Sequence, residues 1–134
     1  MRDPATLARF LPLLEAPGFT AGHMEPVTES AVPGLWLFPH AVLDRVAGEL
    51  VQAAYADGWV MMGFDWVTWS ATPEAAALRD DEAALARASR QRLAKLLTAI
   101  IRQDRFVEGA LLDAFESGLM LRILRRAAAL AKAT

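Results

Sequence analysis

The densest group of polar side chains in the sequence lies between residues 102 and 108. Two arginines and two carboxylates share this segment: Arg102, Asp104, Arg105 and Glu108. Guanidinium groups bind carboxylates and phosphates through paired hydrogen bonds, and a neighbouring carboxylate can act as acid or base on such an anion. The same pattern also suits an internal salt-bridge network that joins the flanking helices. We favour the network and keep an anion-binding site as the alternative.

A second candidate ligand site is the aromatic segment that contains Asp65, Trp66 and Trp69. One interpretation places an indole on the wall of an apolar pocket, with Asp65 as a polar anchor. The other makes Asp65 the N-cap of a helix, with Phe64 and Trp69 packed together as a hydrophobic staple. The second interpretation needs no ligand and explains every residue except Trp66, so we favour it.

A third candidate is a basic face on the last helix. Arg122, Arg125 and Arg126 are spaced three and four residues apart, which brings them together on one side of a helix. This face suits an acidic protein or a nucleic acid as partner, or it is simply solvated. The pI near 5.6 argues against nucleic acid.

The remaining residue types exclude several kinds of chemistry. The sequence has no Cys, which removes disulfides, thiolate nucleophiles and Cys-ligated metal centres. His23 and His40 have no carboxylate at metal-ligand spacing, and no serine lies in a nucleophile elbow. We therefore predict no metal, no cofactor and no catalytic residue, and we leave open whether the chain is an enzyme.

Length and composition indicate a single compact domain over residues 1–134. The chain is 54% hydrophobic and 22% charged, which is too apolar for a disordered segment. No signal peptide is recognisable, and no stretch approaches the roughly 20 apolar residues of a membrane span. We expect a cytoplasmic protein with no membrane association. Residues 1–86 carry 4 basic and 12 acidic side chains and residues 87–134 carry 10 and 4, so the two halves should attract each other.

Hydrophobic periodicity predicts an α+β fold dominated by about five or six helices. A small antiparallel hairpin near the N-terminus, with strands Phe19 to Met24 and Leu35 to Phe38 around the loop Glu25–Gly34, should rest on the helices. Gly109 inside a helix costs about 1 kcal/mol, which suggests close approach of a backbone or a ligand. The helices are expected at 4–16 (kinked or shortened by Pro12), 41–57, 90–103 (capped by Ser89), 105–116 and 119–132, with short helical segments beginning at Asp65, Thr72 and Asp80.

Several spaced motifs occur between Trp59 and Leu130. They are Phe64-Asp65-Trp66-x-x-Trp69, Leu96-Leu97-Thr98, Arg102-x-Asp104-Arg105-Phe106-x-Glu108-Gly109-x-Leu111, Phe115-x-Ser117-Gly118 and Ile123-Leu124-x-Arg126. Together they resemble an uncharacterised bacterial family known as a domain of unknown function. The resemblance implies a small, single-domain bacterial protein in the cytoplasm, and it implies no activity.

These observations favour a non-enzymatic binding or interaction module. The alternatives are a small enzyme that acts on an anionic substrate through the 102–108 cluster, and a nucleic-acid-associated regulator that uses the basic last helix. A second copy of the chain is a further expected partner, because the Ala-rich last helix has few large side chains with which to fill a groove.

Overall fold

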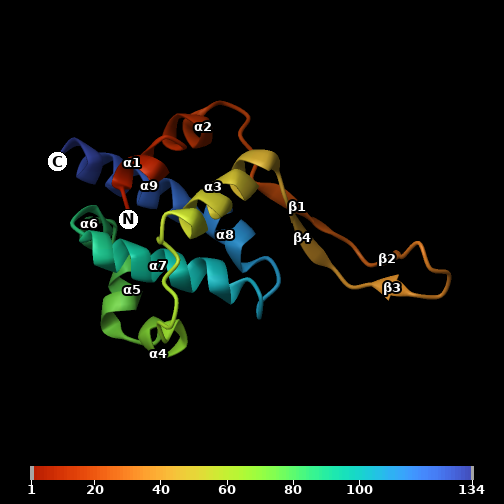
Figure 1. Ribbon diagram of the computed structural model, residues 1–134. Coiled ribbons are helices and arrows are strands. Elements are labelled where there is room, and N and C mark those ends of the chain that lie inside the picture. Colours follow the sequence, from red (N-terminus) through yellow and green to blue (C-terminus); the bar gives the residue numbers. More distant parts are fainter. Residues whose placement is uncertain (1, 134) are drawn as a thin grey trace.

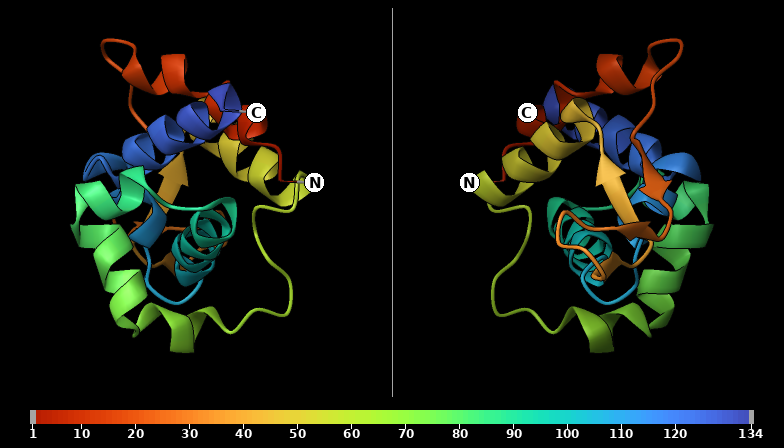
Figure 2. Two further views of the ribbon diagram at one scale, coloured as in Figure 1. Left: turned by 90° about the vertical axis from the view of Figure 1, so that its left-hand side faces the viewer. Right: turned by 90° about the vertical axis from the view of Figure 1, so that its right-hand side faces the viewer.

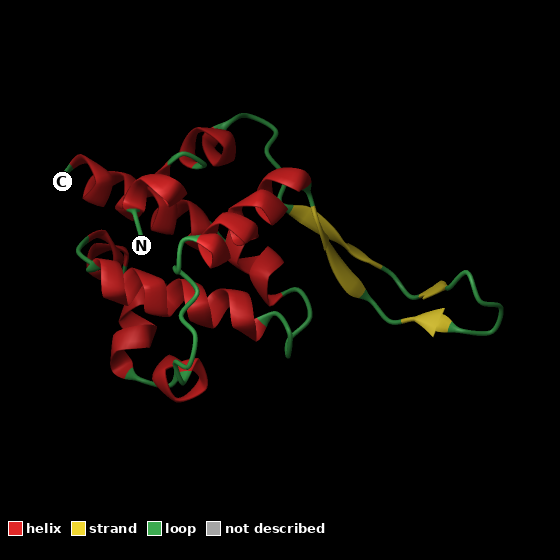
Figure 3. Ribbon diagram, in the orientation of Figure 1, coloured by secondary structure: helices red, strands yellow, loops and turns green. Residues whose placement is uncertain are grey.

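The computed structural model describes residues 2–133, which form a helical body with a two-stranded arm projecting from it (Figure 1 and Figure 3). This part of the chain contains nine helices, so the predicted number of five or six was too low. Four of the nine have only five residues each, and such short helices carry little periodicity. The helices are α1 (Pro4–Ala8), α2 (Leu11–Glu15), α3 (Arg45–Ala56), α4 (Trp66–Ser70), α5 (Pro73–Asp80), α6 (Glu82–Ala86), α7 (Arg90–Gln103), α8 (Ala110–Glu116) and α9 (Leu119–Lys132).

Local sequence signals place many of the helix ends. The ranges of α7 and α9 are as predicted, and the Ser89 hydroxyl caps α7 by accepting a hydrogen bond from the backbone N–H of Arg92 (3.2 Å). Pro12 lies in the first turn of α2, where its missing N–H costs nothing. The single helix predicted over residues 4–16 is therefore divided into α1 and α2.

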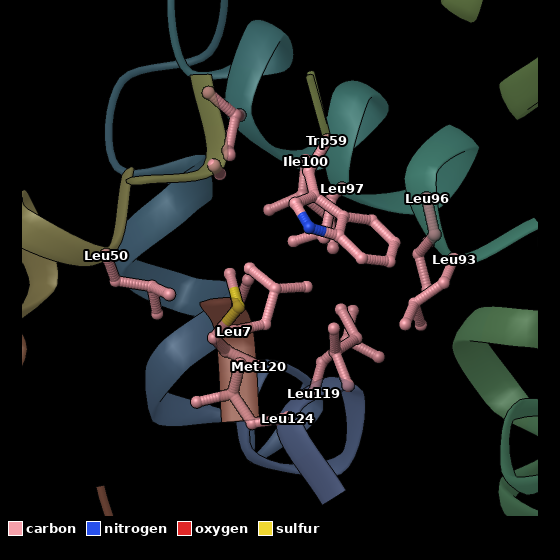
Figure 4. Close-up of a cluster of buried hydrophobic side chains, with 14 of the residues drawn as sticks. Leu7, Leu50, Trp59, Leu93, Leu96, Leu97, Ile100, Leu119, Met120 and Leu124 are labelled. Atoms are coloured by element: carbon pink, nitrogen blue, oxygen red, sulfur yellow. The ribbon is translucent and has the colours of Figure 1, made fainter. Parts of the chain in front are cut away.

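The body is organised around α7. Seen along the molecule in Figure 2, this helix is enclosed by α3, α9 and the segment that carries α4, α5 and α6. Its predicted apolar stripe is buried, and removal of such surface from water is the main contribution to the stability of a helical body. Figure 4 shows the packing of part of this stripe (Leu93, Leu96, Leu97 and Ile100) with side chains from other elements, namely Leu7, Leu50, Trp59, Leu119, Met120 and Leu124.

One buried polar side chain connects α7 to the chain that follows α3. Thr98 is fully buried, and its hydroxyl accepts a hydrogen bond from the backbone N–H of Met61 (2.8 Å). The same hydroxyl donates to the carbonyl oxygen of Ala94 (2.7 Å). The hydroxyl is removed from water and Met61 is half-buried, so the loss of this hydrogen bond would be only partly compensated by solvent. Thr98 thereby holds the segment next to Trp59 against the central helix.

The arm consists of two short antiparallel ladders in series. At its base, β1 (Gly22–Glu25) pairs with β4 (His40–Leu43). Further out, β2 (Thr28–Glu29) pairs with β3 (Trp36–Leu37). An antiparallel hairpin was predicted, and its two strands overlap β1 and β3, but these two strands pair with β4 and β2 and not with each other. The expectation that it rests on the helices was also wrong for its outer part, which extends away from the body (Figure 1).

The start of α3 also differs from the prediction of a helix from residue 41. Residues 41–43 continue β4, and the backbone N–H of Asp44 still bonds to the carbonyl oxygen of Ala21 (2.8 Å). Opposite them, Gly22 has a φ of +153°, and any Cβ there would collide with the carbonyl oxygen of Val42. Only glycine lets the two strands approach so closely. Helical periodicity does not reveal this requirement, so the prediction extended the helix over residues that pair as a strand.

The helix predicted over residues 105–116 begins late, at Ala110. Residues 104–109 form turns, and Gly109 has a φ of +85°, outside the helical region. Gly109 therefore precedes α8 rather than lying inside it. A group does lie close to it, but this is a side chain and neither the backbone nor the ligand that was expected: the sulfur of Met24 lies 3.1 Å from where a Cβ of Gly109 would be. The approaching group belongs to the arm and not to a ligand.

Candidate functional site

The structure brings the first two candidate sites together on one surface. Trp66 of α4 packs against Phe106 of the 104–109 turns, with 6.0 Å between the ring centres. A guanidinium nitrogen of Arg102 lies 4.0 Å from the sulfur of Met62. Phe106 is 77% exposed and Met62 is 80% exposed. We call these four residues the Phe106 patch.

The carboxylates beside this patch bind backbone groups instead of arginines. The Oδ1 of Asp104 accepts a hydrogen bond from the backbone N–H of Leu111 (3.1 Å), which fixes the first turn of α8. Glu108 accepts one from the backbone N–H of Ala41 in β4. Across residues 2–133, no ion pair links the two carboxylates to Arg102 or Arg105. The favoured salt-bridge network was therefore wrong, because the predicted helical spacing is not formed there.

The 104–109 turns are attached to the base of the arm. Glu108 contacts β4 through Ala41, and Gly109 meets Met24 of β1. Phe106, which belongs to the same turns, therefore lies on the side of the patch nearest to the base of the arm. Arg105 is exposed at this place, and it forms no ion pair within the described residues.

Asp65 and Trp69 hold the local fold together. The Asp65 carboxylate accepts hydrogen bonds from the hydroxyl (2.6 Å) and the backbone N–H (3.1 Å) of Thr68, and these bonds lower the pKa of Asp65. Trp69 is only 7% exposed and packs against Phe64, with 6.0 Å between ring centres. The predicted cap and staple are confirmed, which leaves Trp66 as the half-buried aromatic side chain at the surface.

Sequence reasoning missed a polar cluster around Glu74. Its carboxylate accepts a hydrogen bond from the indole N–H of Trp69 (2.8 Å) and pairs with Arg92 (2.6 Å) and Lys95 (4.0 Å) of α7. The indole hydrogen bond and the two cations lower the pKa of Glu74. The cluster joins α4, α5 and α7. From the sequence, Glu74 could be placed only in the first turn of α5. A carboxylate there interacts favourably with the helix dipole, and this alone does not predict the contacts with Trp69, Arg92 and Lys95.

The exposed apolar side chains of the arm were missed as well. Val32, Leu35, Trp36 and Phe38 are between 55% and 84% exposed. In the sequence, Leu35, Trp36 and Phe38 belong to one short apolar run after Pro33 and Gly34, which suits a strand packed on a core. The segment has Pro and Gly but no charged residue between Glu29 and His40. This absence of charge was the only feature of the sequence that could have indicated an exposed apolar surface.

The three arginines of α9 all make contacts within the chain. Arg122 pairs with Glu82 of α6 (3.5 Å), and Arg125 pairs with Glu15 of α2 (3.3 Å). The Nε of Arg126 donates to the carbonyl oxygen of Ala88 (2.8 Å). A surface pocket of about 270 Å³ lies between α6 and α9, lined by Glu82, Leu85, Ala86, Arg122, Arg125, Arg126 and Ala129.

Comparisons with known proteins identify a family but no activity. In the part of the chain that the structure describes, no helix is long and apolar enough to cross a membrane, and no three potential metal-binding side chains come together. No curated protein and no solved structure matches the chain significantly. A family model described as "Family of unknown function (DUF6508)" matches residues 2–133. The chain therefore belongs to this family of unknown function.

Proposed function

We propose that the chain is a non-enzymatic interaction module that binds a second copy of itself through the arm. The supporting observation is the exposure of large apolar side chains along an arm that projects from the body. A contiguous apolar surface of this kind is typical of an interaction site. An isolated two-stranded ribbon is also only marginally stable in water, so a partner that covers it would stabilise it.

A second copy fits because each chain carries both halves of a possible contact. The outer part of the arm carries Leu35 and Trp36, and the base of the arm adjoins the Phe106 patch. If two arms lie side by side in opposite directions, the tip of each arm contacts the base of the other chain's arm. Both contacts then form at once, and the pair is closed by a two-fold axis, which is the commonest symmetry of homo-oligomers.

Charge complementarity supports the same arrangement. Glu29 lies in the outer ladder, where one of its oxygens accepts a hydrogen bond from the backbone N–H of Gly34 (2.9 Å). Arg105 lies exposed at the base of the arm without an ion pair in residues 2–133. In the antiparallel pair, the acidic tip of one arm approaches the basic side chain of the other chain.

The carboxylate contacts of the 102–108 cluster favour this proposal over an enzyme. A general acid or base must be within reach of a substrate proton. Asp104 and Glu108 instead accept hydrogen bonds from the backbone N–H groups of Leu111 and Ala41. Their roles are to hold α8 and the base of the arm.

Site-directed disulfide formation tests the proposal directly, because the natural chain has no cysteine. Two separate proteins, Trp36→Cys and Phe106→Cys, are mixed in equal amounts and oxidised mildly. We expect a mixed disulfide dimer to be the main product. The matched control mixes Leu13→Cys with Phe106→Cys, because Leu13 is an exposed apolar residue of α2 (46%) outside the arm. This mixture should give little mixed dimer.

Sedimentation velocity provides the second measurement. The natural chain should dimerise with increasing concentration, and Phe106→Ser should shift the equilibrium to monomer, whereas Leu13→Ser should not. A chain that stays monomeric at all concentrations, or a Trp36 and Phe106 mixture that cross-links no better than the control, would overturn the proposal.

A further inference from the structure

The pocket between α6 and α9 combines a basic rim with an apolar lining, and it lies at the opposite end of the body from the arm (Figure 1). Arg122, Arg125 and Arg126 line it together with Leu85 and Ala129. Its volume of about 270 Å³ is close to the lower end of the range for small-molecule sites. A pocket of this size suits a small molecule better than an extended polymer.

The three guanidinium groups are held in place but keep donors free for a ligand. The contacts described for them engage one nitrogen each: a terminal nitrogen of Arg122 and of Arg125, and the Nε of Arg126. Each guanidinium has five N–H donors in a rigid planar fork. Because neighbouring elements already orient the three side chains, a ligand that binds them has less side-chain entropy to overcome.

The charges of the pocket indicate the charge of the ligand. Three arginines and Glu82 line the pocket, and Glu15 pairs with Arg125 at its edge. The two carboxylates compensate two of the three positive charges, which leaves one. A ligand with a single negative charge completes this balance, whereas a doubly charged phosphate monoester exceeds it.

The geometry points to a binding site for a small monocarboxylate with a compact apolar part. The carboxylate would accept hydrogen bonds from the free N–H groups of Arg125 and Arg126, because a guanidinium fork matches both oxygens of a carboxylate. The apolar part would lie on the exposed Ala86 and Ala129, which line the pocket together with the buried Leu85. This site is independent of the arm and of self-association.

Titration with sodium benzoate, followed by amide chemical shifts in NMR spectra, tests the site. We expect saturable shifts that are confined to α6 and α9. Benzyl alcohol has a similar shape without the charge, and it should produce no saturable shifts there. Sodium chloride at the same ionic strength corrects for general screening.

Two arginine variants separate the pocket from general positive charge. Arg125→Gln should weaken benzoate binding about tenfold, since it removes a charge-assisted hydrogen bond. Arg45→Gln is the matched control, because Arg45 is an exposed arginine of α3 that pairs with Glu49 (3.5 Å), away from the pocket. Benzoate should bind this variant as it binds the natural chain.

Three results would overturn the inference. In the first, the benzoate shifts are scattered over the surface or do not saturate. In the second, Arg125→Gln binds benzoate as tightly as Arg45→Gln does. In the third, inorganic phosphate or a short DNA duplex shifts the same amides at lower concentration than benzoate, which would assign the pocket to a phosphate group instead.

Discussion

The body and the arm differ in the burial of their large apolar side chains. In the body, Leu7, Trp59 and Leu96 are completely buried, whereas Trp36 and Phe38 of the arm are 58% and 84% exposed. The body thus obtains its stability from contacts within one chain. The arm has a backbone ladder but little packing of its own, so its apolar residues contribute to stability only when another surface covers them.

Truncation of one large side chain in each region should give the largest contrast. Leu96→Ala leaves a cavity next to α7 and should lower the free energy of unfolding by about 2–5 kcal/mol. Phe38→Ala should change it by no more than about 0.5 kcal/mol, because the side chain is already in water. Urea unfolding at a concentration where the chain is monomeric measures both. Similar losses for the two variants would mean that the arm is packed on the body in solution.

The buried hydroxyl of Thr98 supplies a polar test of the body. Thr98→Val keeps the shape but leaves the N–H of Met61 without its acceptor, which should cost about 1–3 kcal/mol. Thr98→Ser retains the hydroxyl and should lose less stability than Thr98→Val. Thermal unfolding of the two variants gives the comparison, and a valine variant as stable as the natural chain would show that this hydrogen bond does not hold the segment.

Two glycines should respond to alanine with opposite signs. Gly109→Ala forces a side chain into the left-handed region beside Met24 and should destabilise the chain by about 1–2 kcal/mol. Gly48→Ala lies inside α3 with open space around it, and it should stabilise the chain by about 0.5–1 kcal/mol. Urea unfolding measures both, and equal effects would mean that the turn at the base of the arm tolerates a side chain.

The smallest expected effect is the pH dependence that comes from Glu74. The indole of Trp69 and the cations of α7 hold the pKa of Glu74 below its usual value of 4.5 in the folded chain. Its contribution is therefore complete above the pKa of the unfolded chain and is lost as the pH falls through the lower, folded-state pKa. Glu74→Gln should flatten the decline in melting temperature in this acidic window. If the melting temperature of Glu74→Gln declines as steeply as that of the natural chain, other carboxylates cause the decline.

The helices of the body could be predicted closely, and the regions around the arm could not. The caps at Ser89 and Asp65 and the stripe of α7 depend on residues close together in sequence. The position of β4 depends on pairing with residues 15 to 21 positions earlier in the sequence and on the close approach that Gly22 allows beside Val42 and Leu43. Periodicity carries no information about such pairing.

The candidate site was found only in part for the same reason. The residues Trp66 and Arg102 were both identified, but their presence on one surface follows from tertiary contacts. The salt-bridge network favoured for residues 102–108 assumed a helix from residue 105, whereas residues 104–109 form turns. The arginines of α9 were grouped correctly, whereas their intramolecular partners Glu15 and Glu82 lie far away in sequence.

The contrast in burial also makes the chain its own fluorescent reporter. Trp36 is the one tryptophan of the arm, Trp66 is half-buried in the Phe106 patch, and Trp59 and Trp69 are buried in the body. A water-soluble quencher should therefore reduce the emission of Trp36 first. Coverage of the arm and of the Phe106 patch by another chain would protect Trp36 and Trp66 and shift their emission to shorter wavelength, while the two buried indoles stay unchanged. Docking and unfolding can therefore be followed separately without a label.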